Sequence, residues 1–356
     1  MDRAFLYKLL STPSVSGCEE PNQINALAFG KTFAHEQKVD CVGNAVSVVN
    51  PEAPFKVLLC GHMDEIGFRV THIQDDGLLR VQRAGGVRPA LYVGSAMQVV
   101  HEAEQDGKAV YNTVPGVVAV TSDLVKSGDV KDKDLLIDIG ASSREEAAAV
   151  VSVGDAVCAD TQVRELMNGR ITCRALDDKS GAFVILEAAK KAAESGARCG
   201  IYAQTSVGEE TTGRGAYVAA AGLKPDCAIV VDVTWASDCP GANPGATGDV
   251  RLGKGPVLCL SGMVNKKMNR LLEKTAHELG IGVQYEVAGG HTSTDGDTIL
   301  QTGEGVPMAL VSVPLRYMHS SVEMASWSDI EQCVDLIAGF LGKVGAGFDF
   351  SPLSVE

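Results

Sequence analysis

Apolar runs separated by helix-like patterns fill both ends of the chain. They predict strands at 45–49, 57–60, 200–205, 228–232, 257–260 and 308–313. They predict helices near 5–10, from Glu19-Glu20 onward, and at 179–195, 213–221, 266–279 and 328–344. Strands that alternate with helices are typical of a mostly parallel sheet with helices on both faces. We therefore expect an α/β domain formed by residues 1–66 and 166–356.

The segment 67–165 has a different pattern. Apolar and polar residues alternate over 68–73, which is the period of a half-buried strand. Further strands are predicted at 78–81, 97–100, 114–120, 135–139 and 156–159, with turn residues between them. A short helix is predicted where the letters SREE form a capping box at 143–146. We therefore expect 67–165 to be an inserted small β-barrel domain.

Acids and histidines occur at or just past the ends of four predicted strands. They are His62 and Asp64 after 57–60, Glu209 and Glu210 after 200–205, Asp232 at the end of 228–232, and His319 after 308–313. Open α/β sheets bind ligands at the carboxyl ends of their strands, so these side chains are expected in one crevice. The pair Asp177-Asp178 opens the next helix and can reach the same place.

Two histidines with three or four carboxylates suit zinc, cobalt or manganese, and two ions better than one. A bridging aspartate can hold two cations about 3.5–4 Å apart, and zinc can lower the pKa of bound water to about 7. The adjacent Glu209 and Glu210 supply one carboxylate for the metal and one for a general base. Each residue alone would more often be a helix cap or a loop residue. The joint pattern over four strands favours a metal site.

Composition narrows the range of partners and locations. The formal charge of −14 disfavours nucleic acid and anionic membranes as partners. Ten cysteines without a Cys-x-x-Cys pair predict buried free thiols in a reducing compartment. No apolar stretch is long enough to span a bilayer, and residues 1–6 lack a signal-peptide pattern. These features predict a cytoplasmic protein.

Seven segments in a fixed order carry a family resemblance. They are 61–68 (GHMDEIGF), 137–141 (IDIGA), 174–181 (RALDDKSG), 207–210 (VGEE), 231–234 (VDVT), 289–295 (GGHTSTD) and 317–320 (YMHS). The chain resembles the tetrahedral (TET) dinuclear metallo-aminopeptidases, which include glutamyl and deblocking aminopeptidases and some members labelled endoglucanase. The resemblance covers essentially the whole chain, so it implies that the α/β domain is a metallopeptidase domain.

The resemblance also implies a role for each candidate residue. Asp177 would bridge two ions, with His62 and Asp232 at one ion and Glu210 and His319 at the other. Glu209 would be the general base, and Asp64 would orient His62. Asp178 is expected to follow an unusual, cis peptide bond. The insertion 67–165 would serve dimerisation, and the dimers would assemble into a hollow homododecamer.

The predicted function is a metal-dependent aminopeptidase that hydrolyses N-terminal residues from short peptides. Two divalent ions, zinc or cobalt and also manganese, would act with Glu209, which activates a metal-bridging water. The alternatives to an aminopeptidase are a two-metal N-acyl amino acid amidohydrolase and a non-catalytic assembly protein. An endoglucanase is disfavoured, because glycosidases normally use two carboxylates and no transition metal. The loop 289–297 with His291 is a candidate pocket lining; acidic, basic and apolar N-terminal residues all stay open as substrates.

Overall fold

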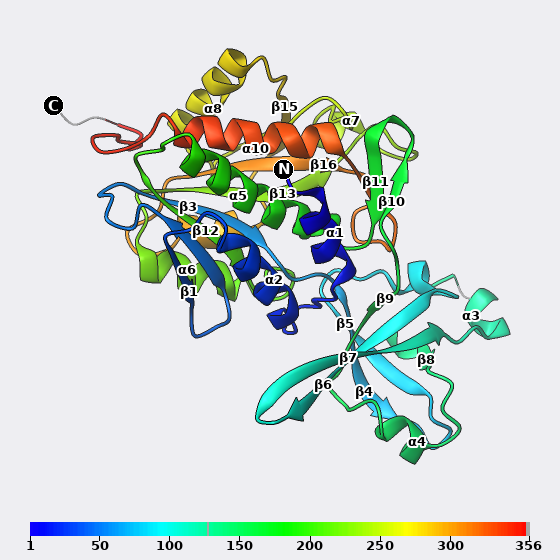
Figure 1. The fold of residues 1–356 in the computed structure, drawn as a ribbon. Coiled ribbons are helices and arrows are strands. Elements are labelled where there is room, and N and C mark those ends of the chain that lie inside the picture. Colours follow the sequence, from blue (N-terminus) through cyan, green and yellow to red (C-terminus); the bar gives the residue numbers. More distant parts are fainter. Residues whose placement is uncertain (127, 354–356) are drawn as a thin grey trace.

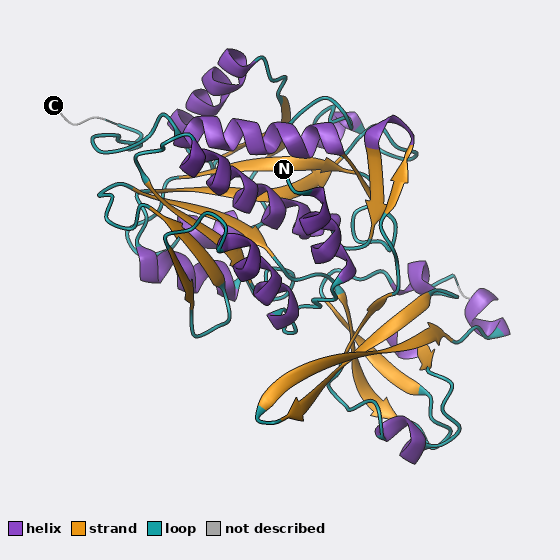
Figure 2. Cartoon of the chain, viewed as in Figure 1, coloured by secondary structure: helices purple, strands orange, loops and turns teal. Residues whose placement is uncertain are grey.

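A computed structural model describes residues 1–126 and 128–353. These residues form a large sheet covered by helices and a closed barrel that lies to one side of it (Figure 1). Figure 2 shows that helices flank the large sheet on both faces, whereas the barrel consists mainly of strands. The predicted fold class is confirmed. Within the described residues, none of the helices combines the length and apolar character needed to cross a bilayer.

The large sheet has eight strands in the order β1-β2-β12-β3-β13-β16-β14-β15. Their bounds are β1 Glu36–Val39, β2 Ala45–Val49, β3 Lys56–His62, β12 Gly200–Ser206, β13 Cys227–Trp235, β14 Val257–Ser261, β15 Gln284–Ala288 and β16 Met308–Leu315. The four central strands β12, β3, β13 and β16 run parallel. Their carboxyl ends therefore meet at one edge. On the flanks, β2 is antiparallel to β12 and β14 is antiparallel to β16.

Helices cover both faces of this sheet. They are α1 Arg3–Ser11, α2 Glu20–Gly30, α5 Leu176–Glu194, α6 Arg214–Leu223, α7 Pro244–Thr247, α8 Lys266–Leu279, α9 Asp295–Leu300 and α10 Trp327–Leu341. The larger core joins one sheet face to α1, α2, α5, α8 and α10, and includes Phe183 and Trp327. The smaller core joins the opposite face to α6 and α9 through Ala216, Ala220 and Ile299. Helix α5 is buried along most of its length, as expected for a helix that is apolar on several sides.

The closed barrel has the strand order β4-β5-β8-β7-β6-β9 and its own hydrophobic core. Its elements are β4 Gly67–Ile73, β5 Leu79–Ala84, η1 Pro89–Tyr92, β6 Ala96–Gln105, β7 Lys108–Val118, α3 Ser122–Lys126, η2 Asp132–Asp134, β8 Leu136–Asp138, α4 Arg144–Ala148 and β9 Ala156–Ala159. The predicted barrel is confirmed. The hydroxyl of Ser143 caps α4 as expected, but the Glu146 carboxylate accepts from the N–H of Ser142 rather than from that of Ser143.

A small third sheet was not expected from the sequence. It has the order β10-β11-β17, with β10 Arg164–Leu166, β11 Arg170–Cys173 and β17 Glu323–Ser326, and the turn η3 Met167–Gly169 joins the first two strands. The exposed residues of β10 give no apolar signal. The sheet matters for the site because β17 and β11 flank the start of α5 and the end of β16.

Gly61 allows the first regular turn of α5 to lie against the end of β3. A Cβ added to Gly61 would lie 2.8 Å from the backbone carbon of Gly181 and 2.9 Å from the nitrogen of Ala182. Both neighbouring atoms belong to the backbone, which cannot rotate away. This close approach brings His62, the last residue of β3, next to Asp177 at the start of α5.

Substitution of Gly61 by alanine tests this close contact. We expect Gly61→Ala to lower the free energy of unfolding by about 1–3 kcal/mol, because the added methyl group overpacks the interface. Gly222→Ala is the control, since a Cβ there meets nothing within 4 Å in an exposed turn of α6; it should be neutral or stabilise by up to about 1 kcal/mol. Urea unfolding measures both. Equal effects of the two substitutions would contradict the packing argument.

Candidate metal centre

The five predicted ligands come together at the edge where the central strands end. His62 closes β3, and Asp177 lies at the start of α5. Asp232 lies within β13, while Glu210 and His319 lie in the loops after β12 and β16. Sequence reasoning placed Asp232 at the end of its strand; β13 instead continues to Trp235, because its apolar and β-branched residues keep pairing with β16.

These side chains form two groups that share one carboxylate. The donor atoms of His62, Asp177 and Asp232 lie within 4.8 Å of one another, and so do those of Asp177, Glu210 and His319. The Nε2 atom of His62 is 3.2 Å from Oδ1 of Asp177, and Nε2 of His319 is 3.3 Å from its Oδ2. Each oxygen of Asp177 therefore faces one histidine. This arrangement has the form of a bridged two-ion site.

The charges of the site fit divalent cations. Burial raises the pKa of Glu209 to about 10 and raises the pKa of Asp232 well above its usual range, and neighbouring carboxylates add to both shifts. The Oε1 atom of Glu210 is buried and has no hydrogen-bond partner among the described residues, with Nε2 of His319 3.5 Å away. Buried acids at such density are favourable only when opposite charge compensates them. Imidazole nitrogens and carboxylate oxygens together suit zinc, cobalt or manganese.

Asp64 links the histidine to the glutamate pair. Its carboxylate accepts the backbone N–H of Glu209 at 3.0 Å and that of Glu210 at 3.2 Å. The Nδ1 atom of His62 lies 3.0 Å from the backbone oxygen of Asp64 and 3.4 Å from its Oδ1. The structure thus brings Asp64 beside His62, as predicted, and adds contacts to the glutamate pair that the sequence did not indicate.

Two further acids position the backbone of the site. The carboxylate of Glu323, on β17, accepts the N–H of Asp177 at 3.1 Å and that of His319 at 2.8 Å. Asp178, which follows Asp177 through a cis peptide bond, accepts the N–H of His62 at 3.2 Å. Sequence reasoning missed Glu323, because no apolar strand precedes it; its only signal was that it lies four residues after His319.

The site opens into a cavity of about 260 Å³. Thr292, Ser293 and Thr294 contribute to its wall, which matches the expectation that the loop 289–297 lines the pocket. His291 is not part of this wall, and its side chain is 73% exposed. The end of the predicted loop is helical, because α9 begins at Asp295 after a cap by Thr294.

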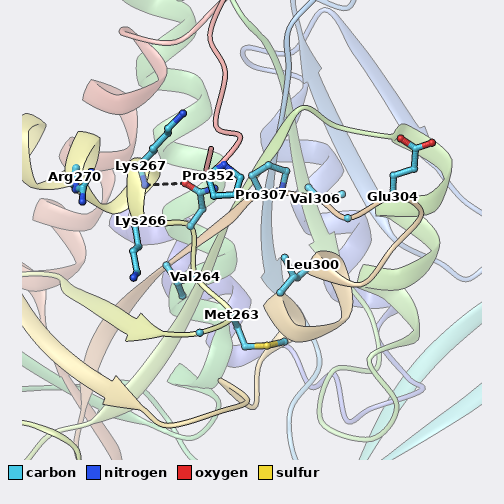
Figure 3. Close-up of a pocket in the computed structure, with 13 residues that line it drawn as sticks. Met263, Val264, Lys266, Lys267, Arg270, Leu300, Glu304, Val306, Pro307 and Pro352 are labelled. Atoms are coloured by element: carbon cyan, nitrogen blue, oxygen red, sulfur yellow. Dashed lines mark hydrogen bonds between the residues drawn. The ribbon is translucent and has the colours of Figure 1, made fainter. Parts of the chain in front are cut away.

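A larger groove of about 530 Å³ lies elsewhere (Figure 3). It is lined by Lys266, Lys267 and Arg270 at the start of α8, and by Val306 and Pro307 where the chain enters β16. His319 follows the opposite end of β16, so this groove is separate from the ligand groups. Its basic side chains offer no metal ligands.

A family model of M42 glutamyl aminopeptidases matches residues 43–336. The chain belongs to the M42 aminopeptidase family. The predicted TET family is thereby confirmed, and peptide hydrolysis by an aminopeptidase follows from membership. The match extends over most of the chain and includes all five candidate ligands.

Known relatives and structures agree with this family. The M42 chain is 32% identical to a lysyl aminopeptidase of Pyrococcus furiosus, over 99% of this chain and 100% of the relative. It resembles a TET aminopeptidase from Thaumarchaeota archaeon SCGC AB-539-E09, with a TM-score of 0.87, 28% identity and 97% coverage of both chains. It also resembles the Pyrococcus horikoshii TET1 peptidase, which can assemble into a tetrahedron or a large octahedral shell, with a TM-score of 0.84, 30% identity and coverage of 96% and 99%.

The buried acids predict how metal binding depends on pH. Burial raises the pKa of Asp232, a candidate ligand, well above its usual range, so the stabilising contribution of its protonated form is full at low pH and is lost as the pH rises through the raised pKa. Divalent cations would replace the bound protons, and metal binding would release them. We therefore expect saturating zinc or cobalt to raise the melting temperature more at pH 8 than at pH 5. Thermal unfolding at constant ionic strength measures this, and a metal effect that is equal at both pH values would contradict it.

Proposed function

We propose that this M42 chain is a two-metal aminopeptidase that removes N-terminal residues from short peptides. Asp177 would bridge two divalent ions, with His62 and Asp232 on one side and Glu210 and His319 on the other. The main support for this proposal is the presence of two groups of candidate ligands that share Asp177. Zinc or cobalt fits these ligands well, and manganese also fits.

The proposed reaction is hydrolysis of the first peptide bond. Two bound cations would lower the pKa of a shared water to about 7 and polarise the scissile carbonyl. Glu209 belongs to neither ligand group, yet its Oε2 lies 3.8 Å from Nε2 of His62. It would accept a proton from the attacking water and return that proton to the leaving amine.

Asp64 would keep Glu209 in place during these transfers. Its hydrogen bonds to the N–H groups of Glu209 and Glu210 fix the turn after β12, so that one glutamate faces the ions and the other faces the substrate. Membership of an aminopeptidase family weighs against both an N-acyl amino acid amidohydrolase and a non-catalytic assembly protein.

We further propose that residues 67–165 form an inserted dimerisation domain in a chain whose catalytic domain is 1–66 and 166–356. Exposed apolar residues on this insertion support the proposal, among them Val120, Val125 and Val153 at 57%, 64% and 63% exposure. Assembly of such dimers into a dodecamer is supported by the TET peptidases that this chain resembles. The free cysteines support a cytoplasmic location, and the negative charge supports the absence of nucleic-acid and membrane partners.

Replacement of Glu209 tests the proposed base. We expect Glu209→Gln to lower kcat about 100- to 10,000-fold on a leucyl p-nitroanilide, because the amide cannot accept the water proton. Bound metal per chain should stay the same, since Glu209 is outside both ligand groups. Glu331→Gln, which changes an exposed glutamate on α10, is the matched control and should have wild-type kcat. A fully active Glu209→Gln enzyme would disprove the assignment of Glu209 as the base. Wild-type activity that survives complete removal of metal by a chelator would disprove the two-metal proposal.

A further inference from the structure

One carboxylate in the wall of the active-site cavity belongs to neither ligand group. Glu286 lies on β15, and its carboxylate accepts hydrogen bonds from two hydroxyl groups. The Oγ1 of Thr234 donates to Oε2, and the Oγ of Ser312 donates to Oε1 at 2.9 Å. The two hydroxyls come from the neighbouring strands β13 and β16. The structure therefore fixes the position of this charge in the cavity.

The sheet sets the position of Glu286 relative to the ligands. Asp232 and Thr234 are two residues apart on β13, so their side chains leave the same face of the sheet. Thr234 is roughly 7 Å farther along the strand than Asp232. Ser312 pairs with Asp232 in the register of β13 and β16, which places its hydroxyl on that face too. Glu286 therefore lies in the same cavity as Asp232, displaced along β13 from the candidate ligands. With the free amino group of a substrate at the ion that Asp232 would hold, its first side chain would extend toward Glu286.

Among the described residues that line the cavity, none is a lysine or arginine that could balance the charge of Glu286. The two histidines of the wall, His62 and His319, are candidate ligands. The other four wall carboxylates carry a total charge of minus four, which two divalent ions would balance without Glu286. No lysine or arginine among the described residues forms an ion pair with Glu286. Burial raises the pKa of this carboxyl in spite of the two hydroxyl donors.

Glu286 also has unused hydrogen-bonding capacity. A carboxylate oxygen can accept two hydrogen bonds, and each oxygen of Glu286 accepts one. An ammonium or guanidinium group could therefore bind both oxygens without displacing a hydroxyl. Val233, Trp235 and Met318 also line the cavity and offer apolar surface to the carbon stem of such a side chain.

From these contacts and charges we propose that Glu286 selects peptides whose N-terminal residue carries a cationic side chain, lysine or arginine. This inference rests on the proposed aminopeptidase function and specifies its substrate class. An N-terminal glutamate would be repelled by the same charge. The names of the family and of a relative, glutamyl and lysyl, point in opposite directions. The charge of this cavity is what distinguishes between them.

Kinetics on three matched substrates test the proposal. The metal-loaded full-length enzyme is assayed with the p-nitroanilides of lysine, of norleucine, which has the same carbon stem without the ammonium group, and of glutamate. We expect kcat/KM for lysine to exceed that for norleucine roughly 10- to 100-fold, which is the effect of a hydrogen-bonded charge pair. Glutamate should be the poorest of the three. A wild-type ratio of lysine to norleucine of one or less would overturn the proposal.

Variants separate a selective role from a structural one. Glu286→Gln should reduce the lysine-to-norleucine ratio toward one, whereas Glu286→Asp keeps the charge and should retain part of the preference. Glu273→Gln is the matched control, because Glu273 contacts the neighbouring Tyr285 outside the cavity and should leave the ratio unchanged. A ratio that Glu286→Gln does not change, with all substrates slowed equally, would show that the carboxylate has only a structural role. If Glu286→Gln fails to fold, the ratio of kcat/KM for lysine to that for norleucine in the wild-type enzyme still tests the preference for a cationic N-terminal residue.

The same assay distinguishes failure of this inference from failure of the proposed function. Cleavage of norleucine p-nitroanilide without preference for lysine would refute the selective role of Glu286 but would still support the proposed aminopeptidase function. Absence of cleavage of all three substrates with zinc, cobalt and manganese in turn would overturn both.

Discussion

The repulsion among buried carboxylates around Asp177 is the constraint on which the rest of the structure depends. Asp177, Glu209, Glu210 and Asp232 all face one small cavity. Charges held so close in a poorly solvated place need compensation by cations or protons. The chain places them there with rigid elements, since parallel central strands end at this edge and α5 begins against β3. The close contact of Gly61 with Gly181 makes that last approach possible.

A surrounding layer of hydrogen bonds holds this arrangement in place. Glu323 joins the backbone at Asp177 to that at His319, and Asp64 joins His62 to the glutamate pair. These partners come from segments far apart in sequence, so the site requires the complete fold. The barrel is connected at the same place, because the chain leaves β3 at His62 and enters β4 at Gly67. A change in the barrel orientation would therefore act on the loop that carries Asp64.

Much of this fold could be predicted, because the central strands are continuous apolar runs with titratable residues behind them. The regular part of α5 begins at Lys179, as its sequence pattern indicates, since Asp177 and Asp178 have non-helical backbone angles. The strand β15 could not be predicted, because its partly exposed residues alternate without an apolar run. Glu286 was missed with it. Its importance arises from pairing between distant strands, and local periodicity contains no such information.

A crystal structure of the zinc-loaded protein, with anomalous difference maps at the zinc absorption edge, would test the two-ion site most directly. We predict two peaks about 3.5–4 Å apart, with one oxygen of Asp177 bound to each. His62 and Asp232 should bind one peak, and Glu210 and His319 the other. A single peak, or two peaks that do not share Asp177, would contradict a two-ion site bridged by Asp177.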